Sequence, residues 1–269
     1  LPGLGELGND DYYLTEPIWN SLNSPIERNS YIWSEDIFEG TLVGNWILPY
    51  KQIFQANIVL DGIENLKDNS SEAGQEYRSV RGQALFYRAV CYWMLADNFC
   101  LPFDGTNPDD LGLPLNLDAQ VGKRQNRSSL KQTYDLILSD LQEAETLLPE
   151  TTRIIARPSA TASRAMLARI YLTMDDYESA LFWAQKVKDS DKYILDFSTL
   201  DSTQAYPIPT FNQEIIWHAE FSQYSSNTSR NGLVDSSLYG LYLPTDLRRS
   251  IFYSPSANGI KFRGNYRGT

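Results

Sequence analysis

Apolar side chains recur every three or four residues along the middle of the chain, which is the spacing of one face of an α-helix. The stretches with this pattern are residues 45 to 62 or 66, about 72–96, and 128 or 129 to 149. Ser128 or Ser129 can cap the last of them, and Pro149 ends it. The pattern therefore predicts long helices that bury one broad face each.

The segment 157–187 has a sharper pattern, because its apolar and small residues fall at the offsets of a tetratricopeptide repeat. These residues are Leu167, Ala168, Tyr171, Tyr177, Ala180 and Ala184. We expect a turn at Asp175 and Asp176, close helix approach at Ala168 and Ala180, and Tyr171 and Tyr177 filling the space on either side. One repeat cannot bury its apolar face alone, so the other helices must stack on it.

Glycine and proline interrupt any helical period in residues 1–42, 98–126 and 190–269. We expect loops there, with short helical pieces near the start and one short apolar element at 214–221. Long loops in compact domains are often functional. The prediction is thus a single all-α domain over 1–269, with tetratricopeptide-like helix pairs at about 44–190 and an irregular, loop-rich ligand-binding face.

Composition and net charge exclude several classes of function. The 269 residues are 42% hydrophobic and 21% charged, as in ordinary globular proteins, and the formal net charge is −11. Such a charge repels a phosphate backbone, so we expect no nucleic-acid partner. No apolar run approaches the roughly 18 residues that a membrane-spanning helix needs. Cys91 and Cys100 are interpreted as packing residues, with one bridge between them as the alternative.

The residues show little that points to catalysis. His218 is the only histidine and has apolar neighbours, which favours a packed side chain over a metal ligand or triad member. Carboxylate pairs occur at 10/11, 109/110 and 175/176, and we interpret them as solvated loop residues. The side chains of Asp104, Asn107, Asp109 and Asp110 could supply oxygen ligands to a calcium ion, but their spacing does not fit the EF-hand loop. We predict no catalytic residue, metal or cofactor.

Aromatic residues are abundant, with 17 Tyr and 6 Trp, and many stand in polar loop sequence. Flat aromatic faces cover the apolar patches of sugar rings, while carboxylate and amide groups bind the hydroxyls at the edges. The candidate ligand-binding residues are Asp10, Asp11, Tyr12, Tyr31 and Trp33, in a segment that also holds Tyr13 and Trp19. The alternative is that Tyr31 and Trp33 close the core under a loop.

Several runs, taken in order, resemble the SusD/RagB family of nutrient-binding outer-membrane lipoproteins of Bacteroidota. They are 46–57 with Trp46, Tyr50 and Asn57, 81–89 (RGQALFYRA), 134–149, 157–159 (RPS) leading into 165–172, 212–217 (NQEIIW), and Asp246 with Arg248. Each run alone is weak, and their order and spacing make the resemblance specific.

The resemblance implies a helical scaffold overlaid by a loop-rich binding face, and no chemistry. It implies a partner, a SusC-type TonB-dependent transporter, and capture of oligosaccharide, polysaccharide or peptide for import. It also implies a cell-surface location in the outer membrane through a lipid on an N-terminal cysteine that this sequence does not contain. The sequence stops in loop residues, before the last helices of such proteins, so we expect a truncated or divergent member.

Two other classes stay open at this point. A tetratricopeptide-type scaffold that binds a peptide would need more consecutive repeats than the one seen here. A helical-toroid glycoside hydrolase would need two carboxylates placed across a cleft.

Overall fold

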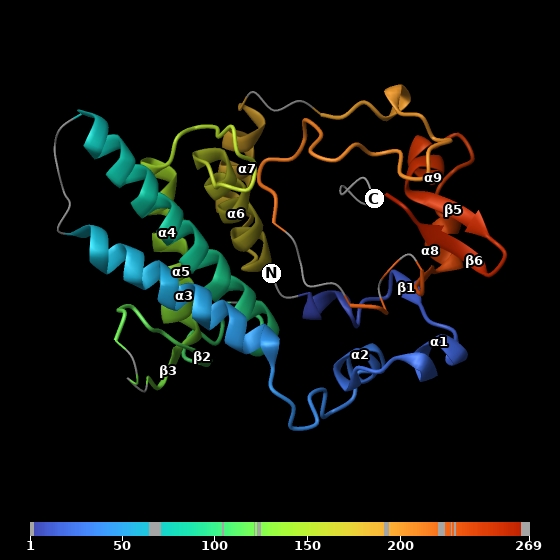
Figure 1. Ribbon diagram of the computed structural model, residues 1–269, viewed down its shortest axis with the longest axis horizontal. Helices are drawn as coiled ribbons and strands as arrows, with labels where there is room; N and C mark the ends of the chain where they lie inside the picture. The colour runs from blue at the N-terminus through green and yellow to red at the C-terminus, as the bar shows by residue number, and fades with distance from the viewer. Residues whose placement is uncertain are drawn as a thin grey trace. The chain divides into compact units, whose positions relative to one another are not determined.

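The computed structural model describes residues 3–64, 71–103, 105–120, 122, 125–190, 194–219, 224–226, 228 and 230–264, with the backbone alone at 71–73 (Figure 1). The chain divides into two compact units. We call residues 44–192 with 216–219 the helical unit, and residues 1–43, 193–215 and 220–269 the loop-rich unit. That the whole chain behaves as one domain stays a prediction.

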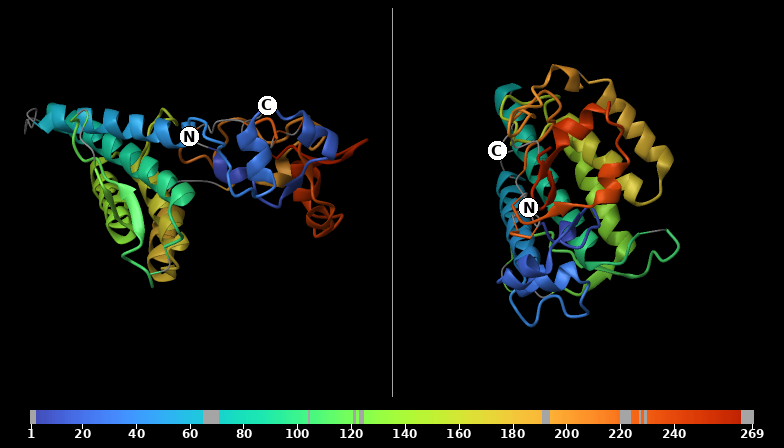
Figure 2. Two further views of the ribbon diagram at one scale, coloured as in Figure 1. Left: turned by 90° about the horizontal axis from the view of Figure 1, so that it is seen from below. Right: turned by 90° about the vertical axis from the view of Figure 1, so that its right-hand side faces the viewer.

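The helical unit consists of antiparallel helices that pack side by side in chain order (Figures 1 and 2). They are α3 (Gly44–Ile63), α4 (Ser71–Phe99), α5 (Leu130–Leu147), α6 (Ala160–Thr173) and α7 (Tyr177–Lys188). The predicted helices are confirmed, and Ser129 is the cap of α5, since its hydroxyl accepts from the Gln132 amide. In the described part of the chain, no helix has the length and apolarity needed to cross a bilayer.

The hairpin α6–α7 confirms the predicted turn. Asp175 has a positive φ of 58°, and the Asp176 carboxylate caps α7 by accepting from the Ser179 amide. Ala180 is buried, as expected at a close helix contact. Tyr177 does not fill the space beside it, because the residue is 64% exposed and its hydroxyl donates to Asp175. The repeat pattern therefore positions the helices correctly but misplaces one of its two tyrosines.

A buried polar network ties α3, α4 and α5 together. The Arg88 guanidinium donates to both carboxylate oxygens of Asp140 at 2.7 and 2.8 Å and to Asn57 Oδ1 at 3.0 Å. The Asn57 amide in turn donates to the carbonyls of Asn116 and Asp118. Every member of this network is satisfied, which is what makes a buried ion pair tolerable.

Both cysteines are free, as the packing interpretation requires. Cys91 lies buried in α4, and burial raises the pKa of its thiol to about 12. Its Sγ donates to the Gln52 side chain on α3. Cys100 follows directly after α4, so the two residues are separated by more than two helical turns.

The loop-rich unit is not purely helical and irregular. Its helices are short: η1 (Leu4–Glu6), α1 (Glu16–Ser21), α2 (Pro25–Tyr31), η3 (Phe197–Thr199), α8 (Ser236–Gly240) and α9 (Leu247–Phe252). A small antiparallel sheet has the strand order β1 (Tyr12–Tyr13), β4 (Leu233–Val234), β6 (Gly259–Phe262), β5 (Tyr253–Ser256). Leu7, Leu14, Ile208, Leu233 and Ile251 belong to its buried core.

Strands are where the all-α prediction is wrong. Besides the four-stranded sheet, β2 (Leu111–Pro114), inside the segment 98–126 predicted to be one long loop, pairs with β3 (Arg127–Ser129), which directly follows that segment. The expected apolar element at 214–221 is neither helix nor strand over its described residues 214–219. Instead, Trp217 packs on Phe86 of α4, 4.9 Å between ring centroids, and donates to the Ala156 carbonyl. The molecule is mostly helical, with small sheets.

Candidate ligand-binding site

Trp33 is the most exposed aromatic residue of the predicted site, with 80% of its surface open to solvent. It directly follows the cap of α2. Its amide donates to the Ser30 carbonyl at 3.2 Å, and the Ser34 amide donates to the Asn29 carbonyl at 2.9 Å. Together these bonds form a Schellman motif, the common hydrogen-bonded end of a helix, with Trp33 at its left-handed position.

The backbone at Trp33 is strained. Its φ is 55°, in the left-handed region where glycine is the usual residue of this motif. The left-handed conformation costs a residue with a Cβ about 1–2 kcal/mol of conformational energy. Because a mostly exposed ring contributes little packing in return, stability does not explain the tryptophan.

The indole rests against the backbone of the first loop. A Cβ built on Gly8 would lie 3.4 Å from Cε2 and Nε1 of Trp33, and 3.1 Å from the Ser30 carbonyl oxygen. Glycine at position 8 therefore allows this close approach. We call Trp33 together with residues 6–10 the Trp33 platform: a supported aromatic ring beside a loop that carries carboxylate and amide side chains.

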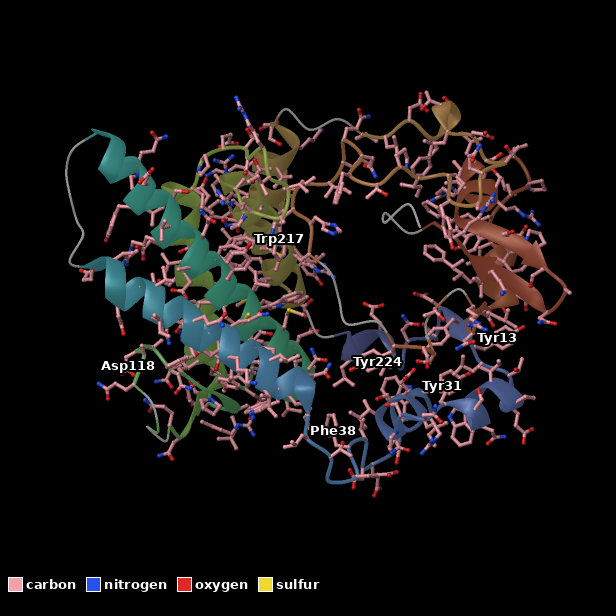
Figure 3. The ribbon with its side chains drawn as sticks, viewed as in Figure 1. Tyr13, Tyr31, Phe38, Asp118, Trp217 and Tyr224 are labelled. Carbon is pink, nitrogen blue, oxygen red and sulfur yellow. The ribbon has the colours of Figure 1, made fainter. Side chains whose placement is uncertain are left out.

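Tyr31, labelled in Figure 3, packs against Tyr12, and both have structural roles. Their ring centroids are 5.9 Å apart. The Tyr12 hydroxyl donates to the Leu7 carbonyl at 2.8 Å, and the Tyr31 hydroxyl accepts from the Leu14 amide at 2.9 Å. Burial raises the pKa of Tyr12. Since both hydroxyls bind backbone, these rings fix the first segment against α2 and support the platform.

Tyr13 faces away from Tyr12, because neighbouring side chains of a strand point to opposite sides, and Asp11 directly precedes this strand. Tyr12 pairs with Val234, and Tyr13 with Leu233. The Tyr13 hydroxyl lies near Gly259 on β6, and the charge of Asp11 helps to raise the pKa of Tyr253, after burial and the Tyr242 hydroxyl. Asp10 is exposed in the platform loop. The structure thus brings Asp10 to the same loop as Gly8 but does not gather all five predicted residues.

Sequence reasoning missed Glu27, which anchors the loop after residue 223. Its buried carboxylate accepts from the Ser226 amide at 2.7 Å and from the Ser225 hydroxyl at 2.9 Å. The contact joins positions almost 200 residues apart, and only an isolated glutamate on α2 hints at it in the sequence. Glu27 therefore holds α2, and Trp33 at its end, to the rest of the loop-rich unit.

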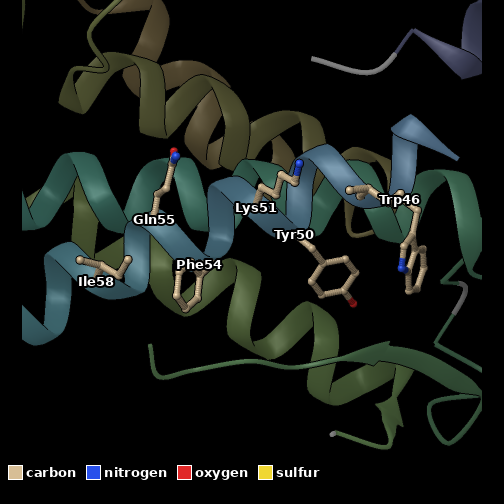
Figure 4. Close-up of a pocket in the computed structure, with 7 residues that line it drawn as sticks. Trp46, Tyr50, Lys51, Phe54, Gln55 and Ile58 are labelled. Carbon is tan, nitrogen blue, oxygen red and sulfur yellow. The ribbon is translucent and has the colours of Figure 1, made fainter. Parts of the chain in front are cut away.

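A second candidate is a groove of about 580 Å³ along α3 in the helical unit (Figure 4). Its lining residues are Trp46, Ile47, Tyr50, Lys51, Phe54, Gln55 and Ile58. Trp46, Tyr50, Phe54 and Ile58 follow one another at four-residue intervals and form an apolar ridge. The Tyr50 hydroxyl already donates to the Pro114 carbonyl, so this ridge offers few groups for sugar hydroxyls.

Nothing in the described residues gathers three or more His, Cys, Asp or Glu side chains as a metal site would. Of the calcium candidates, Asp104 lies outside the described residues, and Asp110 and Asn107 form a backbone turn. Asp176 is a helix cap and Asp175 accepts from Tyr177, so this carboxylate pair has local structural roles. The amide of His218 donates to the Ile155 carbonyl, within the helical unit.

Antiparallel helix pairs packed in chain order, together with a loop-rich unit, define a mostly helical protein built on a helix-pair scaffold. The chain belongs to the SusD-like family described as starch-binding and associating with the outer membrane, whose family model matches residues 7–172. This is a family of binding proteins rather than enzymes, so the glycoside hydrolase alternative is dropped.

Individual relatives agree with this assignment. SusD-like protein P2 of Formosa agariphila is 28% identical over 166 residues, which are 61% of this chain and 30% of the relative. A putative sugar binding protein of Bacteroides vulgatus superposes with a TM-score of 0.78 at 17% identity, covering 98% of this chain and 61% of the other. The surface glycan-binding protein A of Bacteroides uniformis gives 0.69 at 15% identity, covering 97% and 59%.

The two structural relatives share the fold of this chain. At 15–17% identity, this similarity is evidence for the fold alone. The chain spans about a third of the length of the curated relative and about three fifths of each solved structure. The resemblance in the sequence to the SusD/RagB family is confirmed.

Proposed function

We propose that this protein binds oligosaccharide or polysaccharide nutrients at the outer-membrane surface. The observation that carries the proposal is Trp33, a large ring held in solvent at a backbone position that favours glycine. Aromatic faces of this kind stack on the apolar faces of sugars. The description of the family and the names of two structural relatives, a sugar binding and a glycan-binding protein, support the same ligand class.

A panel of neutral glycans tests this proposal. Purified protein is titrated with starch, dextran, xylan, mannan and chitin oligosaccharides by calorimetry. We expect saturable binding to at least one of them. Binding to peptides with no response to any glycan would contradict the proposal and favour the peptide-binding alternative.

We further propose that the ligand is handed to a SusC-type TonB-dependent transporter, with the protein held at the cell surface by an N-terminal lipid. The family's association with the outer membrane supports this partnership. We expect a transporter gene of this type beside the gene for this protein, and co-purification of the two products from detergent-solubilised membranes. Neighbouring genes without such a transporter, or separate elution of the products, would count against it.

A further inference from the structure

Negative charge is concentrated in the segment that carries Trp33. Residues 1–43 contain eight carboxylates and one guanidinium, a net of −7 out of −11 for the 269 residues. The carboxylates are Glu6, Asp10, Asp11, Glu16, Glu27, Glu35, Asp36 and Glu39, and all except Glu27 are exposed. The one cation, Arg28, donates to the Leu22 carbonyl. In the described residues, none of the exposed carboxylates pairs with Lys or Arg, so this charge faces solvent.

Several of these carboxylates lie close along the chain to the residues that form the Trp33 platform. Glu6 and Asp10 lie within two residues of Gly8, on which the indole rests, and Glu35 is two residues beyond Trp33. The Asn29 side chain donates to the Asp36 carbonyl at 3.2 Å and to the Glu39 carboxylate at 2.8 Å, which folds residues 36–39 back onto α2. Acidic residues therefore occur in both chain segments next to the ring, the loop around Gly8 and the residues that follow Trp33, and exposed charges act over about 10 Å in moderate salt.

An exposed indole among carboxylates has the chemistry of a cation site. Tryptophan gives the strongest cation–π attraction of the aromatic side chains, and ammonium groups are also drawn to carboxylates. A uronate or sulfate would instead be repelled. We propose that the Trp33 platform selects glycans that carry free amino groups, such as β-linked glucosamine, over polyanionic glycans. The inference rests on the proposed glycan binding and specifies its ligand class.

Oligosaccharides that differ only in charge test the selectivity. The full chain is titrated at low and high salt with an N-acetylglucosamine oligomer, with the same oligomer after deacetylation, and with an oligogalacturonate of equal length. The pH is kept where the amines are protonated and the carboxylates are ionised. We expect the deacetylated oligomer to bind about three- to tenfold tighter than the acetylated one at low salt. The advantage should shrink at high salt, and the galacturonate should bind most weakly.

Variants that replace carboxylates with uncharged amides test which carboxylates cause the preference for the deacetylated oligomer. Glu35→Gln with Glu39→Gln, two exposed positions outside the platform, is expected to reduce the preference for the deacetylated oligomer without changing affinity for neutral glycans. Glu76→Gln with Glu178→Gln removes the same charge from exposed positions of α4 and α7 and should leave the preference intact. Equal loss in both variants, or tightest binding of the galacturonate, would overturn the inference while glycan binding stands. No response to any glycan would instead refute the proposed function.

Discussion

Trp33→Gly is expected to lose glycan binding by at least about tenfold, since truncating a tryptophan at the centre of a binding site commonly costs about 2 kcal/mol or more. The same change should leave the free energy of unfolding unchanged or raise it by about 1 kcal/mol, because glycine suits the left-handed end of α2. Loss of function with equal or better stability is the signature of a residue kept for binding. Calorimetric titration and urea unfolding measure the two effects.

Two comparisons make this result interpretable. Trp33→Ala should lose binding to the same degree but be about 1 kcal/mol less stable than Trp33→Gly, since alanine keeps the strained Cβ. Tyr177→Ala removes another exposed aromatic ring, on α7 of the helical unit, and should bind glycan normally. If Trp33→Gly unfolds more easily than the unaltered protein and still binds glycan, the ring serves packing, and the platform is not the binding site.

Arg88→Met is expected to destabilise the protein by about 3–5 kcal/mol, because it leaves the Asp140 carboxylate buried without its cation. It also removes a donor from Asn57, which holds the 116–118 loop to α3. Such a loss is a large part of the 5–15 kcal/mol that stabilises a typical domain. Urea unfolding followed by circular dichroism measures it.

The effect of Arg88→Met should depend on pH. Burial raises the pKa of Asp140, and Arg88 opposes that shift, so without the arginine the folded state holds the proton more tightly than the unfolded state does. The added instability is complete above the folded pKa and diminishes as the pH falls toward about 3.9, the pKa of an exposed aspartate. Adding Asp140→Leu should restore most of the stability at neutral pH. A small, pH-independent loss would mean that the pair contributes little.

The helices could be predicted because their causes lie within short stretches of sequence. A regular period over 18 residues, a serine cap at Ser129 and a proline at position 149 determine α5 almost completely. The α6–α7 turn is equally local, since Asp175 and Asp176 provide both the left-handed residue and the cap.

The strands could not be predicted because each is only two to four residues long, too short for alternation to distinguish a strand from a loop. β2 reads Leu-Gly-Leu-Pro and β5 contains Pro255, and both compositions argue for a loop. Their partners are set by distant residues, as when Tyr12 pairs with Val234. Period and propensity carry no information about such pairs.

The sequence indicates which residue types form the candidate site, but not how these residues are arranged in space. Aromatic and acidic residues in irregular sequence pointed to the segment around Trp33, but not to which rings are open. Tyr31 and Trp33 are two residues apart, yet Tyr31 binds the Leu14 amide while Trp33 stands in solvent. That difference depends on the left-handed turn at Trp33 and on the close approach of Gly8, neither of which has a periodic signature.

The most direct measurement follows the tryptophan indole N–H signals in a ¹H–¹⁵N spectrum during titration with a glycan that binds. Trp33→Gly identifies the signal of Trp33 by its disappearance. The Trp217 indole, which donates to the Ala156 carbonyl in the helical unit, is an internal reference. We predict a saturable shift of the Trp33 signal while Trp217 stays in place. A shift of the Trp46 signal, from the α3 groove, with Trp33 unchanged would contradict the account and move the binding site to the helical unit.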